Sequence, residues 1–194
     1  GLALALATSV AVAPNASAYD KYGAAAYADA WALGRNRAYP SFGSDCTNFV
    51  SQALVGGGFS MVGYPKSTTD DHNWWVAPHY WWWDWTYSWS SASHLRQFLI
   101  WHVPGGYSQG QASGSSASTW TPSSVVTGDV LFYDWGGGEG ISHASMQVGW
   151  GTDPNSGWYG NYVDQHTTDR RHAFWSLRPY NSQMASTTTV YFMT

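Results

Sequence analysis

The apolar pattern of this chain changes its period about halfway along, and this change limits the folds open to it. In several segments before about residue 103, apolar side chains recur at the spacing of amphipathic helices. After residue 128, short runs rich in β-branched and aromatic residues are separated by Gly, Asn, Asp and Pro, which is typical of strands. Helices followed by strands predict an α+β fold in which a small antiparallel sheet packs on the helices. The expected strands are DVLFYDW (129–135), HASMQVGW (143–150), NYVDQH (161–166) and TTTVYFM (187–193).

The helices are expected in the first half, where capping residues flank each periodic segment. An aromatic block at 63–89 has no clear period, and a segment rich in Gly, Ser and Gln at 105–119 is interpreted as a flexible loop. The expected helices are residues 21–33, capped by Asp20 and Gly34; residues 46–55, capped by Ser44 or Asp45 and followed by Gly56-Gly57-Gly58; and the segment up to residue 103 that begins after Ser91 or Ser93 and is ended by Pro104-Gly105-Gly106.

The length of 194 residues predicts one domain, and we assign it to residues 19–194. Residues 1–18 form an apolar run that closes on Ala16-Ser17-Ala18, the small-x-small pattern of a signal-peptidase site. We interpret them as a signal-peptide remnant and expect a secreted, extracellular protein. The alternative is an apolar N-terminal arm that packs on the domain. The run is too short to span a bilayer, so no integral membrane span is expected.

The surface is expected to be aromatic and weakly charged. Only 10% of the residues are charged, against about 25% in typical domains, while 18% are aromatic and the formal net charge is -4. A chain with no basic stripe is a poor partner for a phosphate backbone, so nucleic acid is not expected to bind. The protein is expected to be a monomer.

Cys46 is the only cysteine of the chain. An unpaired thiol in an exported protein is a buried inert residue, an intermolecular bridge or a reactive nucleophile. Composition alone favours the inert residue, but the predicted position of Cys46 in the first turn of a helix favours the nucleophile. There, free backbone N–H groups and the helix dipole stabilise a thiolate and can also receive an oxyanion.

A thiolate nucleophile needs a base, and two of the seven histidines are candidates. His143 opens one expected strand, and His166 ends another that would lie beside it. Taken singly, each is more often a surface or core histidine than a catalyst, but together with Cys46 they form a set of nucleophile, base and orienting group. The other five are interpreted as solvated or packing residues, with His172 in a polar turn; they are His72, His79, His94, His102 and His172.

Several stretches resemble the bacterial putative amidase domain family, which is distantly related to the CHAP-type and NlpC-type cell-wall amidases. The resemblance covers nearly the whole chain after residue 18. It implies a papain-like fold with Cys46 as nucleophile, His143 as base on the facing sheet and His166 as the third member. The matching stretches are YDKYGAAAYADAWALGRNRAYPSFGSDCTNFVSQAL (19–54), SWSSASHLRQFL (88–99), GDVLFYDW (128–135), SHASMQV (142–148) and VDQHTTDRRH (163–172).

Two features depart from the family pattern. Ser142 stands where the family often has an acidic residue, which hardly affects the catalytic assignment. The aromatic block is heavier than usual, and this bears on the substrate, because such loops shape the groove. Seven of the fourteen Trp lie at positions 74 to 89. Some should be core, but seven indoles are hard to bury at once, and exposed ones mark a binding site. The candidate substrate-binding residues are Trp81, Trp83 and Trp85.

The identity of the third catalytic residue depends on strand alternation. In NYVDQH, Asp164 and His166 share one face while Gln165 points to the other. The family resemblance favours His166, so we predict that its ring lies within hydrogen-bond reach of the His143 ring, with Asp164 as the competing assignment.

No cofactor and no metal are expected. The His and Asp residues near 70–72 and 164–169 lack a firm ligand spacing, and one cysteine excludes thiolate-rich zinc sites. The sequence therefore predicts a secreted cysteine amidase or peptidase, and the family resemblance implies peptidoglycan peptides as substrate. The alternatives are a non-catalytic wall- or glycan-binding module that uses the Trp-rich block, and an acyltransferase with the same chemistry.

Overall fold

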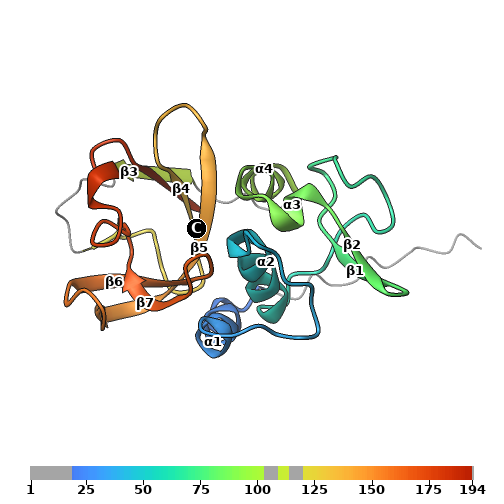
Figure 1. The fold of residues 1–194 in the computed structure, drawn as a ribbon, viewed down its shortest axis with the longest axis horizontal. Helices are drawn as coiled ribbons and strands as arrows, with labels where there is room; N and C mark the ends of the chain where they lie inside the picture. The colour runs from blue at the N-terminus through green and yellow to red at the C-terminus, as the bar shows by residue number, and fades with distance from the viewer. Residues whose placement is uncertain (1–18, 103–108, 114–119, 194) are drawn as a thin grey trace, which may run out of the picture.

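A computed structural model describes residues 19–102, 109–113 and 120–193 of the chain. The expected leader at 1–18 and the expected helix stop at Pro104-Gly105-Gly106 lie outside the described residues. The architecture is α+β: a six-stranded antiparallel sheet lies on one side and the helices and a small two-stranded sheet lie on the other (Figure 1).

The large sheet has the strand order β3-β8-β4-β5-β6-β7. All four strands expected from the sequence belong to it, and β4, β5 and β6 are neighbours joined by successive antiparallel hairpins. The strands are β3 (Gln109–Ser113), β4 (Val130–Asp134), β5 (Ile141–Thr152), β6 (Tyr159–Gln165), β7 (Arg170–Phe174) and β8 (Thr189–Met193), with a 3-10 helix η1 (Ser182–Met184) before β8.

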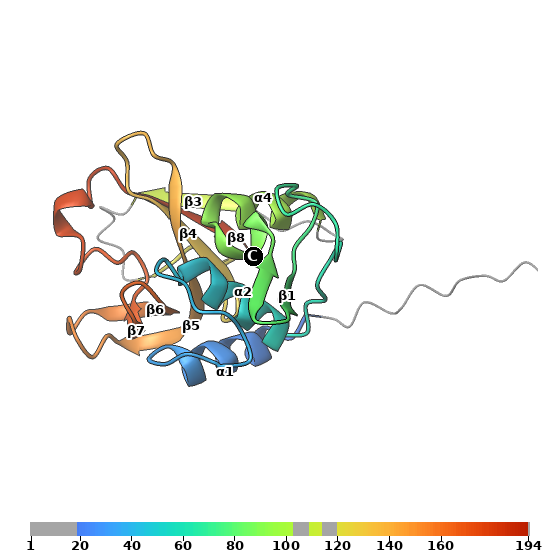
Figure 2. The same ribbon diagram turned by 45° about the vertical axis from the view of Figure 1, so that its right-hand side comes forward.

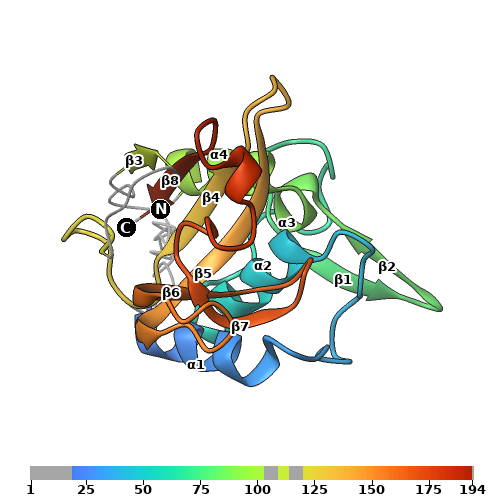
Figure 3. The ribbon, with the colours of Figure 1, turned by 60° about the vertical axis from the view of Figure 1, so that its left-hand side comes forward.

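The helices pack on one face of this sheet. They are α1 (Lys21–Trp31), α2 (Cys46–Gly56), α3 (Tyr87–Ser90) and α4 (Ala92–His102). Phe49 and Leu54 of α2 pack with Ala144 and Met146 of β5 in the main core. Figure 3 shows α1 along the β6–β7 side of the sheet. On the opposite face of the sheet a second core forms, which includes Leu131, Tyr133, Val163, Phe174 and Trp175.

Buried tryptophans fix α2 against α4. Trp74 and Trp89 are fully buried, and their ring centroids lie 5.1 Å apart. Each indole N–H has an acceptor on α2: Trp74 donates to Ser51 Oγ at 3.1 Å and Trp89 donates to Asn48 Oδ1 at 2.7 Å. Because each indole N–H has an acceptor, burial of these rings leaves no donor unpaired. Truncation of either side chain should lower the free energy of unfolding by about 3 to 5 kcal/mol. These two belong to the core, as the sequence analysis expected of part of the block.

Several elements were not expected from the sequence, among them the short helices α3 and η1. The aromatic block contains a hairpin of β1 (Val76–His79) and β2 (Trp82–Trp85), whose four-residue strands are too short to show a period. Strand β3 lies within the segment interpreted as a flexible loop. His172, assigned to a polar turn, lies in β7, where charged residues on an edge strand hide the alternation. At α1 the helix ends at Trp31, and Gly34 lies beyond its C-cap, Ala32.

Two loops extend from this framework. The β4–β5 hairpin, residues 135–140, projects beyond the sheet (Figure 2). The β1–β2 hairpin points away from the sheet, on the far side of α2 (Figure 1). Among the helices within the described residues, none combines the length and the apolar character that crossing a bilayer requires.

Candidate active site

Cys46 is the first residue of α2, and its side chain is 5% exposed. The preceding residue, Asp45, occupies the N-cap position, but its carboxylate makes no cap hydrogen bond to the helix. Helix amides in the first turn have no intrahelical acceptor, so their dipoles remain directed at the space in front of the helix. The sulfur of Cys46 therefore lies at the positive end of α2.

His143 reaches Cys46 from the facing sheet. The β5–β6 pairing ends at Met146↔Asp164, so His143 lies on a part of β5 that extends past the β6 ladder. Its ring lies close enough to the Cys46 thiol to lower the pKa of that thiol, by hydrogen bonding and by its charge. Its other interaction is through Nε2, which lies 3.0 Å from Oε1 of Gln165. Because Gln165 engages Nε2, Nδ1 is the ring nitrogen left for the sulfur.

Two aromatic rings, those of Tyr133 and Trp135, pack against the imidazole of His143. The centroids of Tyr133 and Trp135 lie 5.4 Å and 5.8 Å from that of His143. The Tyr133 hydroxyl is itself fixed, since it donates to the Trp175 carbonyl at 2.7 Å. The imidazole therefore has a packed ring face and one nitrogen held by Gln165, so its orientation is fixed.

The electrostatics of this pair favour the thiolate. Burial alone would raise the pKa of the Cys46 thiol, but the hydrogen bond and the charge of His143, the backbone N–H of Ala144 and the Thr47 hydroxyl lower it to about 7. Oγ1 of Thr47 lies 3.7 Å from the sulfur. A substantial fraction of Cys46 is then thiolate at neutral pH, and this is the reactive form of cysteine.

The predicted contact between His143 and His166 is wrong: Gln165 occupies that position. Strand alternation does separate Gln165 from its two neighbours, but it is the Gln165 face that meets His143. Asp164, the competing assignment, accepts a hydrogen bond from the backbone N–H of His172 and faces α1. The sequence analysis placed Gln165 on the opposite face of this strand from Asp164 and His166. It was wrong only about which face meets His143.

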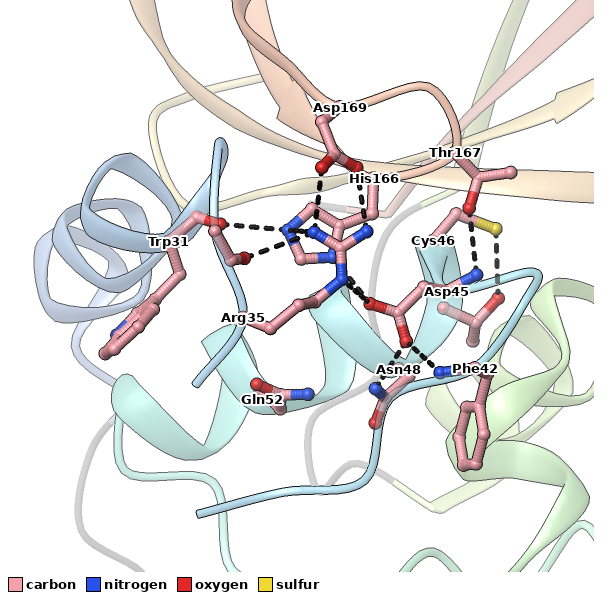
Figure 4. A network of polar contacts seen from close by, with 12 residues as sticks. Trp31, Arg35, Phe42, Asp45, Cys46, Asn48, Gln52, His166, Thr167 and Asp169 are labelled. Carbon is pink, nitrogen blue, oxygen red and sulfur yellow. Dashed lines mark hydrogen bonds and ion pairs between the residues drawn. The ribbon is translucent and has the colours of Figure 1, made fainter. Parts of the chain in front are cut away.

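His166 lies in a separate buried network in front of α2 (Figure 4). Its Nδ1 is 2.7 Å from Oδ2 of Asp45, and its Nε2 is 2.9 Å from the carbonyl oxygen of Trp31. The ring also packs on Phe49, with centroids 4.2 Å apart. His166 and Asp45 are 2% and 0% exposed, so this pair is part of the interior.

Arg35 completes the network and was not singled out in the sequence. It contacts Oδ2 of Asp45 at 2.8 Å and forms a bidentate pair with Asp169. Burial alone would raise the pKa of Asp45, but hydrogen bonds from His166, Asn48 and the backbone N–H of Phe42 lower it below its usual value. The carboxylate next to Cys46 is thus ionised and held from several sides, which fixes the start of α2.

The three candidate binding tryptophans occupy different environments. Trp81 lies at the tip of the β1–β2 hairpin and is 89% exposed. Trp83 and Trp85 are half-buried and pack on the main core, and the Trp85 ring lies 4.7 Å from that of Phe42, in the loop that leads to Cys46. Trp82, which was not among the candidates, is 49% exposed. The exposed aromatic surface of the hairpin is therefore its tip.

A hollow of about 280 Å³ lies beside His143, at the projecting β4–β5 hairpin. Trp135, which packs on His143, and Ser142, the residue before it, both line the hollow, and Glu139 adds an acidic group. A second hollow of the same size lies elsewhere, between α1 and the sheet, around Lys21 and Trp150. Only the first has a wall in contact with the candidate base.

The fold and the Cys46–His143–Gln165 contacts define an α+β protein with a candidate cysteine nucleophile at a helix start and a histidine on the facing sheet. The chain belongs to the family described as "Putative amidase domain", whose model matches residues 18–191. This confirms the family expected from the sequence.

Two curated relatives from Bacillus subtilis (strain 168) are similar to the chain. It is 30% identical to "Uncharacterized protein YhbB" over 176 residues, which are 90% of this chain and 50% of that protein. It is 31% identical to "Uncharacterized protein YjcM" over 139 residues, 71% of this chain and 27% of that protein. The chain thus spans half or less of the length of these relatives. No solved structure gives a significant match.

Proposed function

We propose that this domain is a cysteine-dependent amidase or peptidase with a papain-like arrangement of its site. Cys46 is the nucleophile, His143 the general base and acid, and Gln165 the residue that orients the imidazole. The observation that carries the proposal is the position of the buried His143 ring, which lowers the pKa of the Cys46 thiol and whose Nε2 lies 3.0 Å from Gln165 Oε1. The membership in an amidase family supports the choice of an amide as substrate.

The mechanism begins with transfer of the thiol proton to His143. The Cys46 thiolate attacks the amide carbonyl carbon, a C–S bond forms, and the carbonyl π electrons move to oxygen. The resulting oxyanion is placed near the backbone N–H of Cys46 at the start of α2. The imidazolium then protonates the amine nitrogen as the C–N bond breaks, which leaves a thioester. Water attacks the thioester, His143 takes its proton, and the C–S bond breaks to release the acid.

The proposed substrate is an amide bond in the peptides of peptidoglycan, and the proposed location is outside the cell. Both rest on the family resemblance and on the leader-like pattern of residues 1–18. The wall of the hollow beside His143 combines the Trp135 ring with Glu139, which suits a ligand that has an apolar part and an amino group.

The test is digestion of purified peptidoglycan, followed by mass spectrometry of the soluble fragments. The wild-type protein should release peptides with one new carboxyl end and one new amino end, which shows that water was added across an amide. The Cys46→Ala protein should release none. Identical fragments from both proteins, or fragments cut in the glycan, would contradict the proposal. A digest that contains an added amine separates transfer from hydrolysis, since a transferase would attach that amine to the new carboxyl end.

A second candidate is a non-catalytic wall- or glycan-binding module, favoured by the exposed tip of the β1–β2 hairpin. Tyr80 and Trp81 are 84% and 89% exposed and have ring centroids 6.0 Å apart. Aromatic rings of this kind form stacking surfaces for sugar rings, and exposed apolar patches mark binding sites. Peptidoglycan binding by wild-type and Cys46→Ala protein alike, with no fragment released by either, would favour this function.

A further inference from the structure

A group of metal-ligating side chains lies outside the Cys46 site, on the other side of β6. It consists of Asp29 of α1, Asp164 of β6 and His172 of β7. One ligand atom from each residue lies within 4.8 Å of the others. The three residues are up to 143 positions apart in the chain, so no sequence spacing could have shown the group. It is a product of the packing of α1 on the β6–β7 edge.

Asp164 supplies the observation that points to a ligand. Its side chain is 0% exposed, and its Oδ1 accepts a hydrogen bond from the backbone N–H of His172. Its Oδ2 is buried and has no hydrogen-bond partner among the residues that the structure describes. An unpartnered carboxylate oxygen in the interior is costly. The carboxyl groups of Asp164 and Asp29 lie close enough to interact, and two carboxylates that share a site need a proton or a cation between them.

The other two residues make the position accessible. The side chains of Asp29 and His172 are 36% and 27% exposed, so an ion can enter from solvent without opening the core. The imidazole of His172 is held by stacking on Tyr162, with centroids 4.2 Å apart and planes at 17°. Its Nε2 lies 2.7 Å from Oδ1 of Asp29, and Arg171 contacts the same oxygen at 3.0 Å. Asp164 therefore lies at the buried end of the group, and Asp29 and His172 lie at its solvent-exposed end.

We propose that Asp29, Asp164 and His172 form a binding site for a divalent transition ion of the Zn²⁺ type. One imidazole nitrogen with two carboxylates suits Zn²⁺, whereas Ca²⁺ and Mg²⁺ prefer oxygen ligands alone. Zn²⁺ bonds of about 2.0 to 2.2 Å in a tetrahedron place ligand atoms about 3.4 Å apart. Small rotations of the half-exposed Asp29 and His172 side chains would bring the three ligand atoms to these separations, and water would complete the coordination.

The competing explanation is a proton shared by the two carboxyl groups. Burial raises the pKa of Asp164 to about 8, and the charge of Asp29 adds to this effect against the opposing hydrogen bond from the His172 N–H. A bound ion would replace that proton and tie α1 to β6 and β7. Since Asp164 directly precedes Gln165, the ion would also stiffen the strand that orients His143. The site is independent of the proposed amidase chemistry.

The test is titration of Zn²⁺ into the full, untagged chain in a Cys46→Ala background, which removes the thiol as a competing ligand. Calorimetry should show one Zn²⁺ per chain, and the melting temperature should rise with Zn²⁺ concentration. Asp164→Asn and His172→Gln should each weaken the affinity by roughly 100-fold or more, since even groups that only support ligands cost 10- to 100-fold. Mg²⁺ should bind far more weakly than Zn²⁺.

The matched control is His94→Gln, which removes another histidine paired with an aspartate, Asp71. It should bind Zn²⁺ as tightly as its parent. Asp164→Asn is expected to fold, because its amide can donate to Asp29 as a protonated carboxyl would. If it does not fold, Asp29→Asn on the surface of α1 takes its place. No saturable Zn²⁺ binding, or unchanged affinity in the folded ligand variants, would overturn the site in favour of the shared proton.

Discussion

Replacing Gln165 with Ala should raise the pKa of the Cys46 thiol. Gln165 Oε1 accepts from His143 Nε2 at 3.0 Å, and the two side chains are only 1% and 5% exposed. When Cys46 is a thiolate and His143 an imidazolium, this hydrogen bond is made to a charged donor. Its loss therefore destabilises the ion pair more than the neutral pair, and the thiol holds its proton to a higher pH.

The expected shift of the thiol pKa follows from the free energy that such a hydrogen bond contributes. A hydrogen bond to a charged group contributes about 1.5 to 3 kcal/mol, which corresponds to a rise of about one to two pH units in the thiol pKa. From a pKa of about 7 in the wild-type protein, Gln165→Ala should reach about 8 to 9. The thiolate fraction at pH 7 would then fall roughly 5- to 50-fold.

The assay is the rate of Cys46 alkylation by iodoacetamide as a function of pH, which needs no substrate. The wild-type rate should rise through a midpoint near pH 7 as the thiolate forms, and the Gln165→Ala midpoint should lie above it. Gln165→Glu keeps an acceptor and should keep the midpoint at or below that of the wild type. Gln147→Ala is the matched control, because this glutamine is equally buried but donates to the Gly149 carbonyl. If Gln165→Ala and Gln147→Ala have the same midpoint as the wild type, Gln165 does not orient the base.

Three further results are expected. Cys46→Ala should abolish turnover in the peptidoglycan digest while the melting temperature changes little, since loss of one sulfur leaves only a small void; residual turnover would point to another nucleophile. The double variant Trp81→Ala, Trp82→Ala should weaken binding to insoluble peptidoglycan by about 1 to 3 kcal/mol without loss of stability, because both rings are exposed; a large drop in melting temperature with unchanged binding would assign them to packing. His166→Ala should lower the free energy of unfolding in urea by about 2 to 4 kcal/mol, because it removes a buried ring together with its hydrogen bonds to Asp45 and the Trp31 carbonyl; unchanged stability would show that the remaining partners of Asp45 hold the start of α2 without His166.

The sequence predicted those parts of the fold in which local pattern and tertiary packing agree. The helix that begins at Cys46 has apolar residues at helical spacing and a Gly run behind it, and the same face packs on the sheet. Strands β4, β5, β6 and β8 were found because each combines aromatic or β-branched residues with flanking turn residues. Strand β7 was missed because its pattern, RRHAF, begins with three charged or titratable residues. Its strand state comes from pairing with β6, and a single sequence does not contain that information.

The residues of the candidate site likewise include some that were predicted from the sequence and some that were not. The convergence of Cys46 and His143 was expected from the family resemblance, and local pattern placed the two residues at a helix start and a strand start. The third member was not, because alternation only says which residues share a face. Which face meets His143 depends on where the β5–β6 ladder ends, and it ends at Asp164, just before the residues in question. The roles of Asp45 and Arg35 depend on contacts between residues more than 100 positions apart, such as Asp45 with His166.

The candidate site depends on the register of the residues at the end of β6. Three consecutive residues point to three different neighbours: Asp164 to α1 and β7, Gln165 to His143, and His166 to the Asp45 carboxylate in front of Cys46. Because side chains alternate along a strand, a slip of one residue would exchange these neighbours and place a carboxylate or an imidazole where the amide now lies. The register upstream is set by the pairs Tyr162↔Phe174 and Val163↔Ala173, of which Val163, Ala173 and Phe174 belong to the second core, and it shifts once between Val163 and Gln165. The orientation of the base and the anchoring of the nucleophile therefore depend on one register, and core substitutions at Val163 or Ala173 should impair both together.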